Sequence, residues 1–226
     1  MSTVQLEICC TSSQAAQIAE KAGAARIELC ESLEVGGITP STACLTETVS
    51  ALQIPVHVLI RCRAGNFVYT AHEHQLHLQQ IEMALRLNIK GVVVGSLNEH
   101  GILLQQAKEL RAAAKGISCY FHKAFDEIHD QSAALEQLIE LGYDGILTSG
   151  GPSTALNGQQ QLHRLLAQAH NKLVIMPGGG IRSNHAKALH HFLHASWYHS
   201  AANGSQGFAI FEEEIKQLKA ALNASE

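Results

Sequence analysis

Long apolar runs are missing from this sequence of 226 residues, and so is any concentration of basic residues. A membrane-spanning helix needs roughly 18 consecutive apolar residues, and no segment reaches that length. The 16 lysines and arginines are outnumbered by 20 acidic residues and are spread along the chain, which argues against nucleic acid or a membrane surface as a partner. The first residues lack the basic and long apolar regions of a signal peptide. We therefore expect a cytoplasmic protein.

Several motifs that indicate a cofactor are also absent. The six cysteines include no CxxC pair or other spacing typical of a zinc site. The sequence has neither a GxxxxGK[ST] loop nor a GxGxxG turn, so neither of these nucleotide-binding loops is predicted. Any metal site must therefore be assembled in three dimensions from separate strands. Many of the 14 histidines cluster within expected helices, and we interpret most of these as solvated helix faces.

The sequence does contain a regular alternation of short β-rich runs and longer amphipathic stretches. The eight runs are Val4–Cys10, Arg26–Cys30, Val56–Arg61, Gly91–Gly95, Ser118–His122, Gly145–Ser149, Leu173–Met176 and Ser196–Ser200. The stretches between them have the length and periodicity of helices. Alternating units imply a parallel sheet, and eight units without a linker favour a closed (β/α)8 TIM barrel of the α/β class over an open doubly wound sheet. We therefore predict a single barrel domain over residues 1–226.

Helix starts are marked by side chains that can accept hydrogen bonds from the unpaired N–H groups of a first turn. These residues are Ser12 or Ser13, Ser41, Asp130, and Ser183 or Asn184. Gly23, Gly116 and Gly142 follow helical segments, as expected of C-terminal caps.

The residues of each strand separate into an apolar and a polar set, because alternate side chains point to opposite faces. In the first strand Leu6, Ile8 and Cys10 share one face, whereas Glu7 and Cys9 share the other. The same division recurs in the second, third and fifth strands. We expect the apolar sets to face the helices and the polar sets to point into the barrel, with their last members at its mouth.

Charged side chains inside a barrel are costly unless they are paired or solvated. Glu7 and Glu28 have inward parity, and Arg61 and Arg63 lie two residues apart where the third strand ends. One interpretation is a buried ion network in which the glutamates pair with Arg26, Arg61 or Arg63. The other is a polar pocket in which Arg61 and Arg63 bind a carboxylate or phosphate. The sequence leaves both open.

The fifth strand ends in FHKAFD, which contains His122 and Asp126. Histidine titrates near neutral pH and a nearby carboxylate can fix its tautomer, so this pair suits proton transfer. We predict that His122 is a general acid or base oriented by Asp126, with Glu7 or Glu28 as its catalytic partner. A histidine with a purely structural role is the alternative.

Glycines cluster where the sixth and seventh strands end, in LTSGG and MPGGGIR. Glycine lets backbone N–H groups approach a ligand closely, and helix N-termini favour anions. Phosphate sites in these barrels often form after the seventh and eighth strands. We therefore predict that Ser149, Gly178, Gly179 and Arg182 bind an anion, with tight turns as the simpler interpretation. His199, in the eighth strand, also has a parity that can face the mouth.

Cys9 and Cys30 end neighbouring strands with the same parity. Two thiolates on adjacent parallel strands can lie close enough to share a soft ion, and Cu(I) prefers such sulfur ligands. The alternative is that both are small buried hydrophobic residues, as free cysteines commonly are. The residues alone leave both interpretations open, with Cys10 as a third ligand if its strand twists.

These strand ends together resemble the CutC family, which is assigned to copper homeostasis. The matching segments, in family order, are LEICC, ARIELCESLEVGGITPS, IPVHVLIRCRAGNFVY, FHKAFD, LTSGG and MPGGGIR. The resemblance implies a (β/α) barrel, a cytoplasmic location, a homo-oligomer, and copper binding by Cys9 and Cys30. It brings no established enzymatic reaction with it.

Two functions therefore stand side by side. The first is a copper homeostasis protein whose partner is Cu(I), which the resemblance favours. The second is a barrel enzyme that acts on a small phosphorylated or carboxylated metabolite, with acid–base chemistry by His122 and Asp126. The polar residues that point into the barrel favour this second function.

Overall fold

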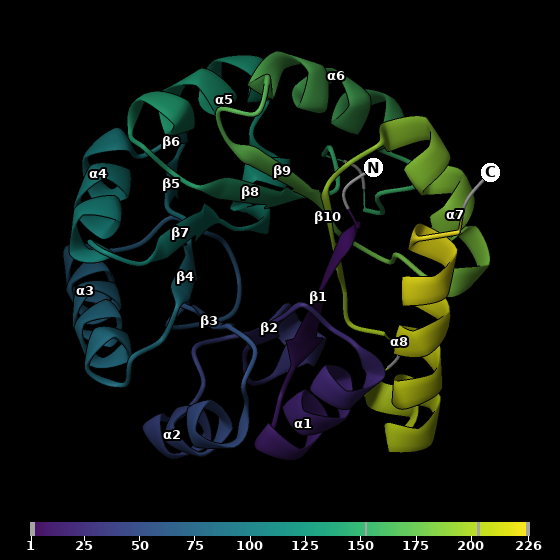
Figure 1. Ribbon diagram of the computed structural model, residues 1–226. Coiled ribbons are helices and arrows are strands. Elements are labelled where there is room, and N and C mark those ends of the chain that lie inside the picture. The colour runs from purple at the N-terminus through teal and green to yellow at the C-terminus, as the bar shows by residue number, and fades with distance from the viewer. Residues whose placement is uncertain (1–2, 152, 203, 225–226) are drawn as a thin grey trace.

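The computed structural model describes residues 3–151, 153–202 and 204–224. Within these ranges eight strands form one parallel sheet in the order β10-β1-β2-β3-β4-β7-β8-β9. They are β1 (Gln5–Cys10), β2 (Arg26–Leu29), β3 (Val56–Leu59), β4 (Gly91–Val94), β7 (Ser118–Phe121), β8 (Gly145–Thr148), β9 (Val174–Pro177) and β10 (Trp197–Ser200). The sheet curls so that β9 and β10 lie side by side, which makes a nearly closed barrel (Figure 1). The predicted TIM barrel is confirmed.

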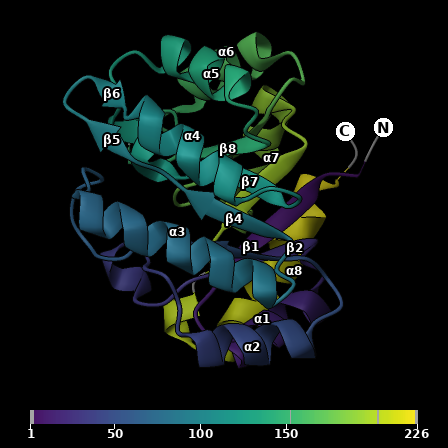
Figure 2. The ribbon, with the colours of Figure 1, turned by 90° about the vertical axis from the view of Figure 1, so that its left-hand side faces the viewer.

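Among the described residues, eight α-helices surround these strands, as Figures 1 and 2 show. They are α1 (Ser13–Ala22), α2 (Thr42–Ala51), α3 (Ala71–Arg86), α4 (Leu104–Ala113), α5 (Gln131–Glu140), α6 (Gln159–Ala169), α7 (Ser183–Leu193) and α8 (Phe208–Leu222). The connections contain the 3-10 segments η1 (Leu33–Val35), η2 (Lys123–Glu127) and η3 (Gly204–Gln206), and the short antiparallel pair β5 (Leu97–Asn98) and β6 (Gly101–Ile102). None of the helices in the described ranges has the length and apolar character that crossing a membrane requires.

Most of the predicted helix caps are confirmed. The side chains of Ser12, Ser41 and Asp130 each accept a hydrogen bond from the N–H group three residues further on. Gly23 ends α1 with a φ of 99°, a left-handed conformation that glycine adopts without strain. Local sequence signals therefore fix the ends of these helices.

The cap predicted at Ser183 or Asn184 is wrong. Helix α7 already includes Ser183, and Arg182 precedes it. The Ser183 hydroxyl donates to Glu214 Oε2 at 2.8 Å, and the Ser183 N–H donates to Glu214 Oε1 at 2.7 Å. A carboxylate of α8 thus satisfies the start of α7 from outside, a tertiary contact that no local motif reveals.

The two faces of the barrel sheet contribute to two separate hydrophobic clusters. On the outer face, strand residues such as Leu6, Ile8 and Ile27 pack with helix residues such as Ala16 and Leu45. The smaller cluster inside the barrel consists of Cys9, Cys30, Leu59, Val93, Tyr120, Leu147 and Met176. The predicted division of the strands into outward and inward sets is confirmed.

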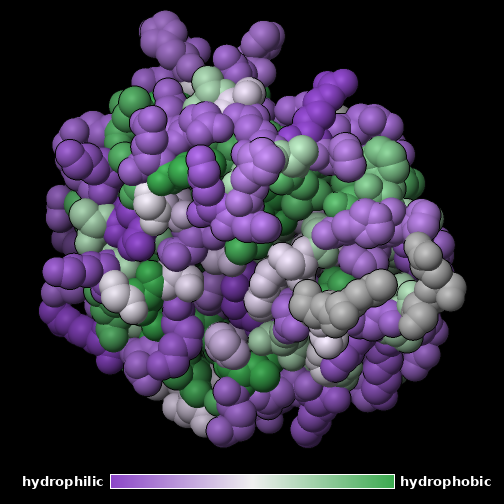
Figure 3. All heavy atoms as spheres, turned by 45° about the horizontal axis from the view of Figure 1, so that its top comes forward, coloured by the Kyte–Doolittle hydropathy of each residue, from purple (hydrophilic) through white to green (hydrophobic). Residues whose placement is uncertain are grey.

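Hydrophilic residues cover most of the face drawn in Figure 3, and hydrophobic residues form small groups between them. Phe208 and Ile210, near the start of α8, are large apolar side chains with 43% and 47% of their surface accessible. A few exposed apolar side chains are common on folded proteins. The predicted homo-oligomer stays a prediction.

Candidate functional site

A cavity of about 190 Å³ opens at the mouth of the barrel, where the strands end. Seven of the twelve predicted site residues line it, namely Cys9, Glu28, Cys30, Arg61, His122, Gly179 and Arg182. His199 and Lys123 also belong to its wall. The other predicted site residues, Glu7, Arg63, Asp126, Ser149 and Gly178, lie outside this wall as the described residues form it. Only some of the predicted site residues therefore lie where they can contact a ligand in the cavity.

The two predicted sulfur ligands lie together. Cys9 Sγ and Cys30 Sγ are 3.4 Å apart, and the two side chains are 5% and 0% exposed. The parallel ladder brings them together, because the Cys30 N–H donates to the Cys10 carbonyl just beyond the end of β2. The contact with Cys30 and burial raise the pKa of the Cys9 thiol well above its ordinary value. Cys10 points to the helix side, so it does not join the pair as a third ligand.

An imidazole and a carboxylate stand beside this sulfur pair. The ligand atoms of Cys9, Glu28 and His199 all lie within 4.8 Å of one another, a grouping that could hold a metal ion. Burial raises the pKa of Glu28 to about 6. Burial alone would lower the pKa of His199, but Glu28 and Glu7 raise it above its ordinary value. Strand parity placed His199 near the mouth but gave it no role.

Below the cavity, Glu7 lies at the centre of a buried ion network. Arg26 Nε contacts Glu7 Oε2 at 2.5 Å, and His199 Nδ1 contacts Glu7 Oε1 at 2.7 Å. Burial would raise the pKa of Glu7, yet Arg26 and His199 hold it well below its usual range. The Arg26 guanidinium also stacks on Trp197 and Tyr120, at 4.0 and 4.6 Å from the ring centres. The predicted pairing of Glu7 with Arg26 is confirmed, and Glu7 is a network residue.

Arg61 reaches the cavity but pairs with neither glutamate. Its guanidinium donates to the carbonyls of Val35, Gly37 and Gly65 at 2.8–3.0 Å. The side chain is only 5% exposed, so these bonds fix a buried cation in the cavity wall. The interpretation that placed Arg61 in an ion network with Glu7 or Glu28 is wrong.

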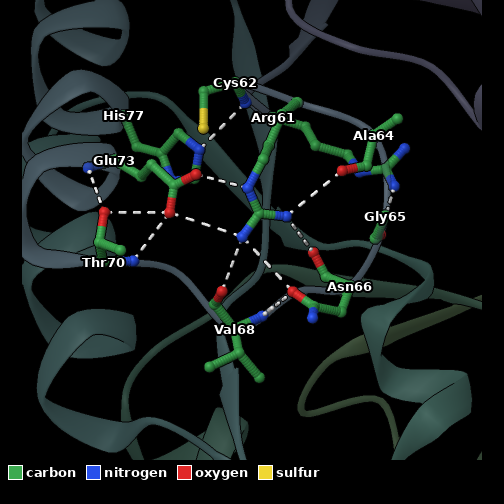
Figure 4. Close-up of polar contacts among 10 residues, drawn as sticks. Arg61, Cys62, Ala64, Gly65, Asn66, Val68, Thr70, Glu73 and His77 are labelled. Atoms are coloured by element: carbon green, nitrogen blue, oxygen red, sulfur yellow. Dashed lines mark hydrogen bonds and ion pairs between the residues drawn. The ribbon is translucent and has the colours of Figure 1, made fainter.

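Arg63, predicted to face the mouth, instead clamps the loop that follows β3. Figure 4 shows this loop, with Asn66, Val68, Thr70 and Glu73 labelled. The Nε of Arg63 donates to Glu73, and its two terminal nitrogens donate to the carbonyls of Asn66 and Val68 at 3.0 and 2.8 Å. Glu73 in turn completes the capping box of α3 with Thr70. The prediction failed because β3 ends at Leu59, so strand alternation no longer decides where residue 63 points.

The predicted pairing of His122 with Asp126 is wrong. His122 Nδ1 accepts the N–H of Ala124 at 3.1 Å, and its Nε2 is buried without a hydrogen-bond partner among the described residues. Burial, together with Arg61 and His77, lowers the pKa of His122 to about 3. The ring is therefore neutral, and a proton on Nε2 is the tautomer that this hydrogen bond fixes.

Asp126 belongs to a neighbouring turn. Its carboxylate accepts hydrogen bonds from the Thr148 hydroxyl at 2.5 Å, from the Ser149 N–H and hydroxyl, and from the Lys123 ammonium at 2.7 Å. The reason is local, because β7 ends at Phe121 and the 3-10 segment η2 turns residue 126 toward the end of β8. Asp126 ties two strand exits together.

The predicted anion-binding loops contribute unequally. Gly179, with a φ of 102°, lines the cavity, and a Cβ there would lie 3.2 Å from Lys123 Nζ. Gly178 is a packing residue, because a Cβ would meet Leu147 Cδ1 at 2.5 Å. Ser149 is engaged with Asp126 and Lys123.

Arg182 lines the cavity as well, at the start of α7. Its Nη1 donates to the Ile181 carbonyl at 2.7 Å. The anion site predicted at the strand ends thus retains Gly179 and Arg182 near the cavity.

Comparisons with known proteins agree with this architecture. The CutC family model matches residues 4–204. The family protein CutC of Pasteurella multocida (strain Pm70) is 40% identical over 187 residues, 82% of this chain and 77% of that protein. The human copper homeostasis protein cutC homolog is 37% identical over 223 residues, 98% of this chain and 82% of that protein. A CutC crystal structure from Streptococcus agalactiae superposes with a TM-score of 0.84 at 30% identity, covering 88% of this chain and 99% of its own. This chain therefore belongs to the CutC family.

Proposed function

We propose that this chain is a copper homeostasis protein that carries Cu(I) between Cys9 and Cys30. The observation that carries the proposal is the separation of 3.4 Å between the two sulfur atoms at the wall of a cavity. Cu(I) is a soft ion that favours thiolates and accepts few ligands, so two sulfurs suffice. Relatives that bear the name of copper homeostasis, the human homologue among them, support the same function.

The surroundings of the sulfur pair suit a bound cation. Two thiolates and one Cu(I) ion carry a net negative charge, and the raised pKa of His199 favours a protonated imidazole beside them. Glu28 also stands within reach as an additional donor. All six cysteines are free, as expected in the reducing cytoplasm where we place this activity.

Anaerobic titration with Cu(I) against a competing chelator tests the proposal. We expect one tightly bound equivalent, and at least a hundredfold weaker binding after Cys9→Ala or Cys30→Ala, because one thiolate alone cannot hold the ion as well. Cys44→Ala is the matched control, since this partly buried thiol lies in α2 and outside the cavity wall. Tight uptake by the Cys9→Ala/Cys30→Ala double variant would exclude the proposed site.

A further inference from the structure

The cavity at the mouth is much larger than a metal ion requires. Its volume is about 190 Å³, whereas a single water molecule needs roughly 10–15 Å³ on the same kind of measure. The sulfur pair comes from the ends of β1 and β2. Arg61, His122 and Lys123, which follow β3 and β7, have no part in copper binding and also line the cavity.

Arg61 is a buried cation without a counter-ion. Its hydrogen-bond acceptors are the neutral carbonyls of Val35, Gly37 and Gly65, and no carboxylate of the described residues forms an ion pair with it. Burying an uncompensated charge is unfavourable, so an arginine held this way is prepared for an anion. Arg63 provides the contrast within the same loop, because Glu73 already neutralises it.

His122 is a buried hydrogen-bond donor without an acceptor. The Ala124 N–H occupies its Nδ1, which leaves the proton on Nε2, and no described residue accepts that proton. The ring has a fixed position, with Phe67 at 4.8 Å and no room for a side chain at Gly95, where a Cβ would lie 2.4 Å from the imidazole. Buried polar groups are almost always paired in folded proteins, so an unpaired donor in a cavity wall points to a ligand oxygen.

Lys123 adds an ammonium group at the same wall, although Asp126 already balances its charge. Its ammonium contacts Asp126 at 2.7 Å and Ser149 at 2.9 Å, and its side chain remains 41% exposed. Glu28, the carboxylate in the wall, has a partner of its own in His199 at 3.6 Å. Apolar surface for a short carbon skeleton comes from Leu33, Leu59, Phe67 and Leu147.

We propose that the cavity binds a small organic oxyanion, a carboxylate or phosphate ester, in addition to any metal at the sulfur pair. Arg61 and Lys123 hold the anionic group, and the Nε2–H of His122 donates to a further oxygen of the ligand. His122 is thus a neutral donor in this site and not the acid or base of a histidine–aspartate pair. The proposal does not depend on copper binding, because it uses different side chains.

Calorimetric titration of the copper-free, reduced full-length chain with pyruvate and with glycerol 3-phosphate tests this site. These probes separate the two oxyanion classes, and glycerol is the uncharged control. We expect one of the two anions to bind with a stoichiometry of one and glycerol not to bind. Arg61→Gln weakens that binding at least tenfold, whereas Arg63→Gln, the matched arginine outside the cavity, changes it less than twofold. Absence of binding by both anions, or an equal loss in both variants, would overturn the proposal.

Two further measurements keep the test decisive if Arg61→Gln fails to fold. Lys123→Gln removes a cavity charge without breaking the backbone contacts of Arg61, and we expect it to weaken binding about fivefold. Nitrogen-15 NMR of the His122 ring must show a proton on Nε2 whose resonance moves downfield with the bound probe. An unchanged His122 signal, or full affinity in Lys123→Gln, rules the site out. Because the titration uses the copper-free chain, its outcome is independent of whether Cys9 and Cys30 bind copper.

Discussion

The barrel contains two polar regions that differ in how completely they are satisfied. In the middle, the network of Glu7, Arg26 and His199 is complete, because Arg26 contacts one carboxylate oxygen of Glu7 and His199 the other. Beside this network, the Nδ1 of His57 has no hydrogen-bond partner among the described residues. At the mouth, the hydrogen-bond acceptors of Arg61 among the described residues are backbone carbonyls, its guanidinium lies over the Phe67 ring, and the Nε2 of His122 has no hydrogen-bond partner there. Both regions consist of side chains with inward parity, so the strand pattern alone does not distinguish them.

This difference teaches which buried polar groups to interpret as structure and which as function. A complete network stabilises the arrangement that it spans and gains nothing from a ligand. A buried polar group without a partner is unfavourable for stability until a ligand supplies the missing hydrogen bond or charge. The comparison therefore predicts that the polar residues in the middle of the barrel control stability, whereas those at its mouth control ligand binding. Mutations can test the two regions separately.

The largest expected effect is on the complete network. Arg26→Met leaves the carboxylate of Glu7 buried with only the imidazoles of His199 and His57 near it among the described residues, and breaking a buried pair in this way costs about 3–5 kcal/mol. Urea denaturation at pH 7 measures the loss. The double variant Glu7→Gln/Arg26→Met is the control, and we expect it to recover part of the stability because no uncompensated charge remains. A loss below about 1 kcal/mol in Arg26→Met would contradict the comparison.

Sequence reasoning worked inside the strands because alternation is a property of the strand itself. It placed Cys9 and Cys30 on one face, and the β1–β2 ladder then brought their sulfur atoms to 3.4 Å. It also placed Glu7 and Arg26 together, in the register that pairs them directly. These contacts depend only on parity and on the order of neighbouring strands.

The same reasoning failed immediately beyond the strand ends. Arg63 and Asp126 lie four and five residues after the last residues of β3 and β7, where turn geometry and tertiary hydrogen bonds decide the direction of a side chain. Glu73 captures Arg63, and the β8 exit captures Asp126. The sequence pattern does not mark Glu73 or the end of β8 as a partner, so only the folded structure reveals these contacts.

A second, smaller effect concerns pH and the histidine of the middle region. His57 is 2% exposed, and burial together with Arg26 lowers its pKa from 6.5 to about 3. The unfolded chain then takes up a proton below pH 6.5 that the folded chain refuses, so stability falls as the pH falls from 6.5 toward 3. At pH 5 this amounts to about 2 kcal/mol for one histidine.

His57→Phe tests this contribution, because a phenylalanine ring can occupy the same space against Tyr120. Urea denaturation at pH 7 and pH 5 must show a smaller acid loss for the variant, by about 2 kcal/mol, than for the wild type. The pH dependence of stability that His199 contributes has the opposite sign. The raised pKa of His199 contributes stability at low pH that disappears as the pH rises through the folded value. Equal acid losses in His57→Phe and the wild type would show that His57 is protonated in the fold.

The smallest expected effect on stability concerns Arg63, in the loop after β3. Arg63→Gln removes a partly exposed ion pair with Glu73, in which the two side chains are 36% and 19% accessible, so solvent screens the interaction and we expect a much smaller loss of stability than in Arg26→Met. The capping box between Thr70 and Glu73 remains, and with it the start of α3. Thermal denaturation of Arg63→Gln beside Thr70→Ala, which removes that cap, ranks the two contributions. If Arg63→Gln destabilises the chain as much as Arg26→Met does, Arg63 stabilises the fold as strongly as the buried network does. The proposed difference between the middle and the mouth of the barrel would then be wrong.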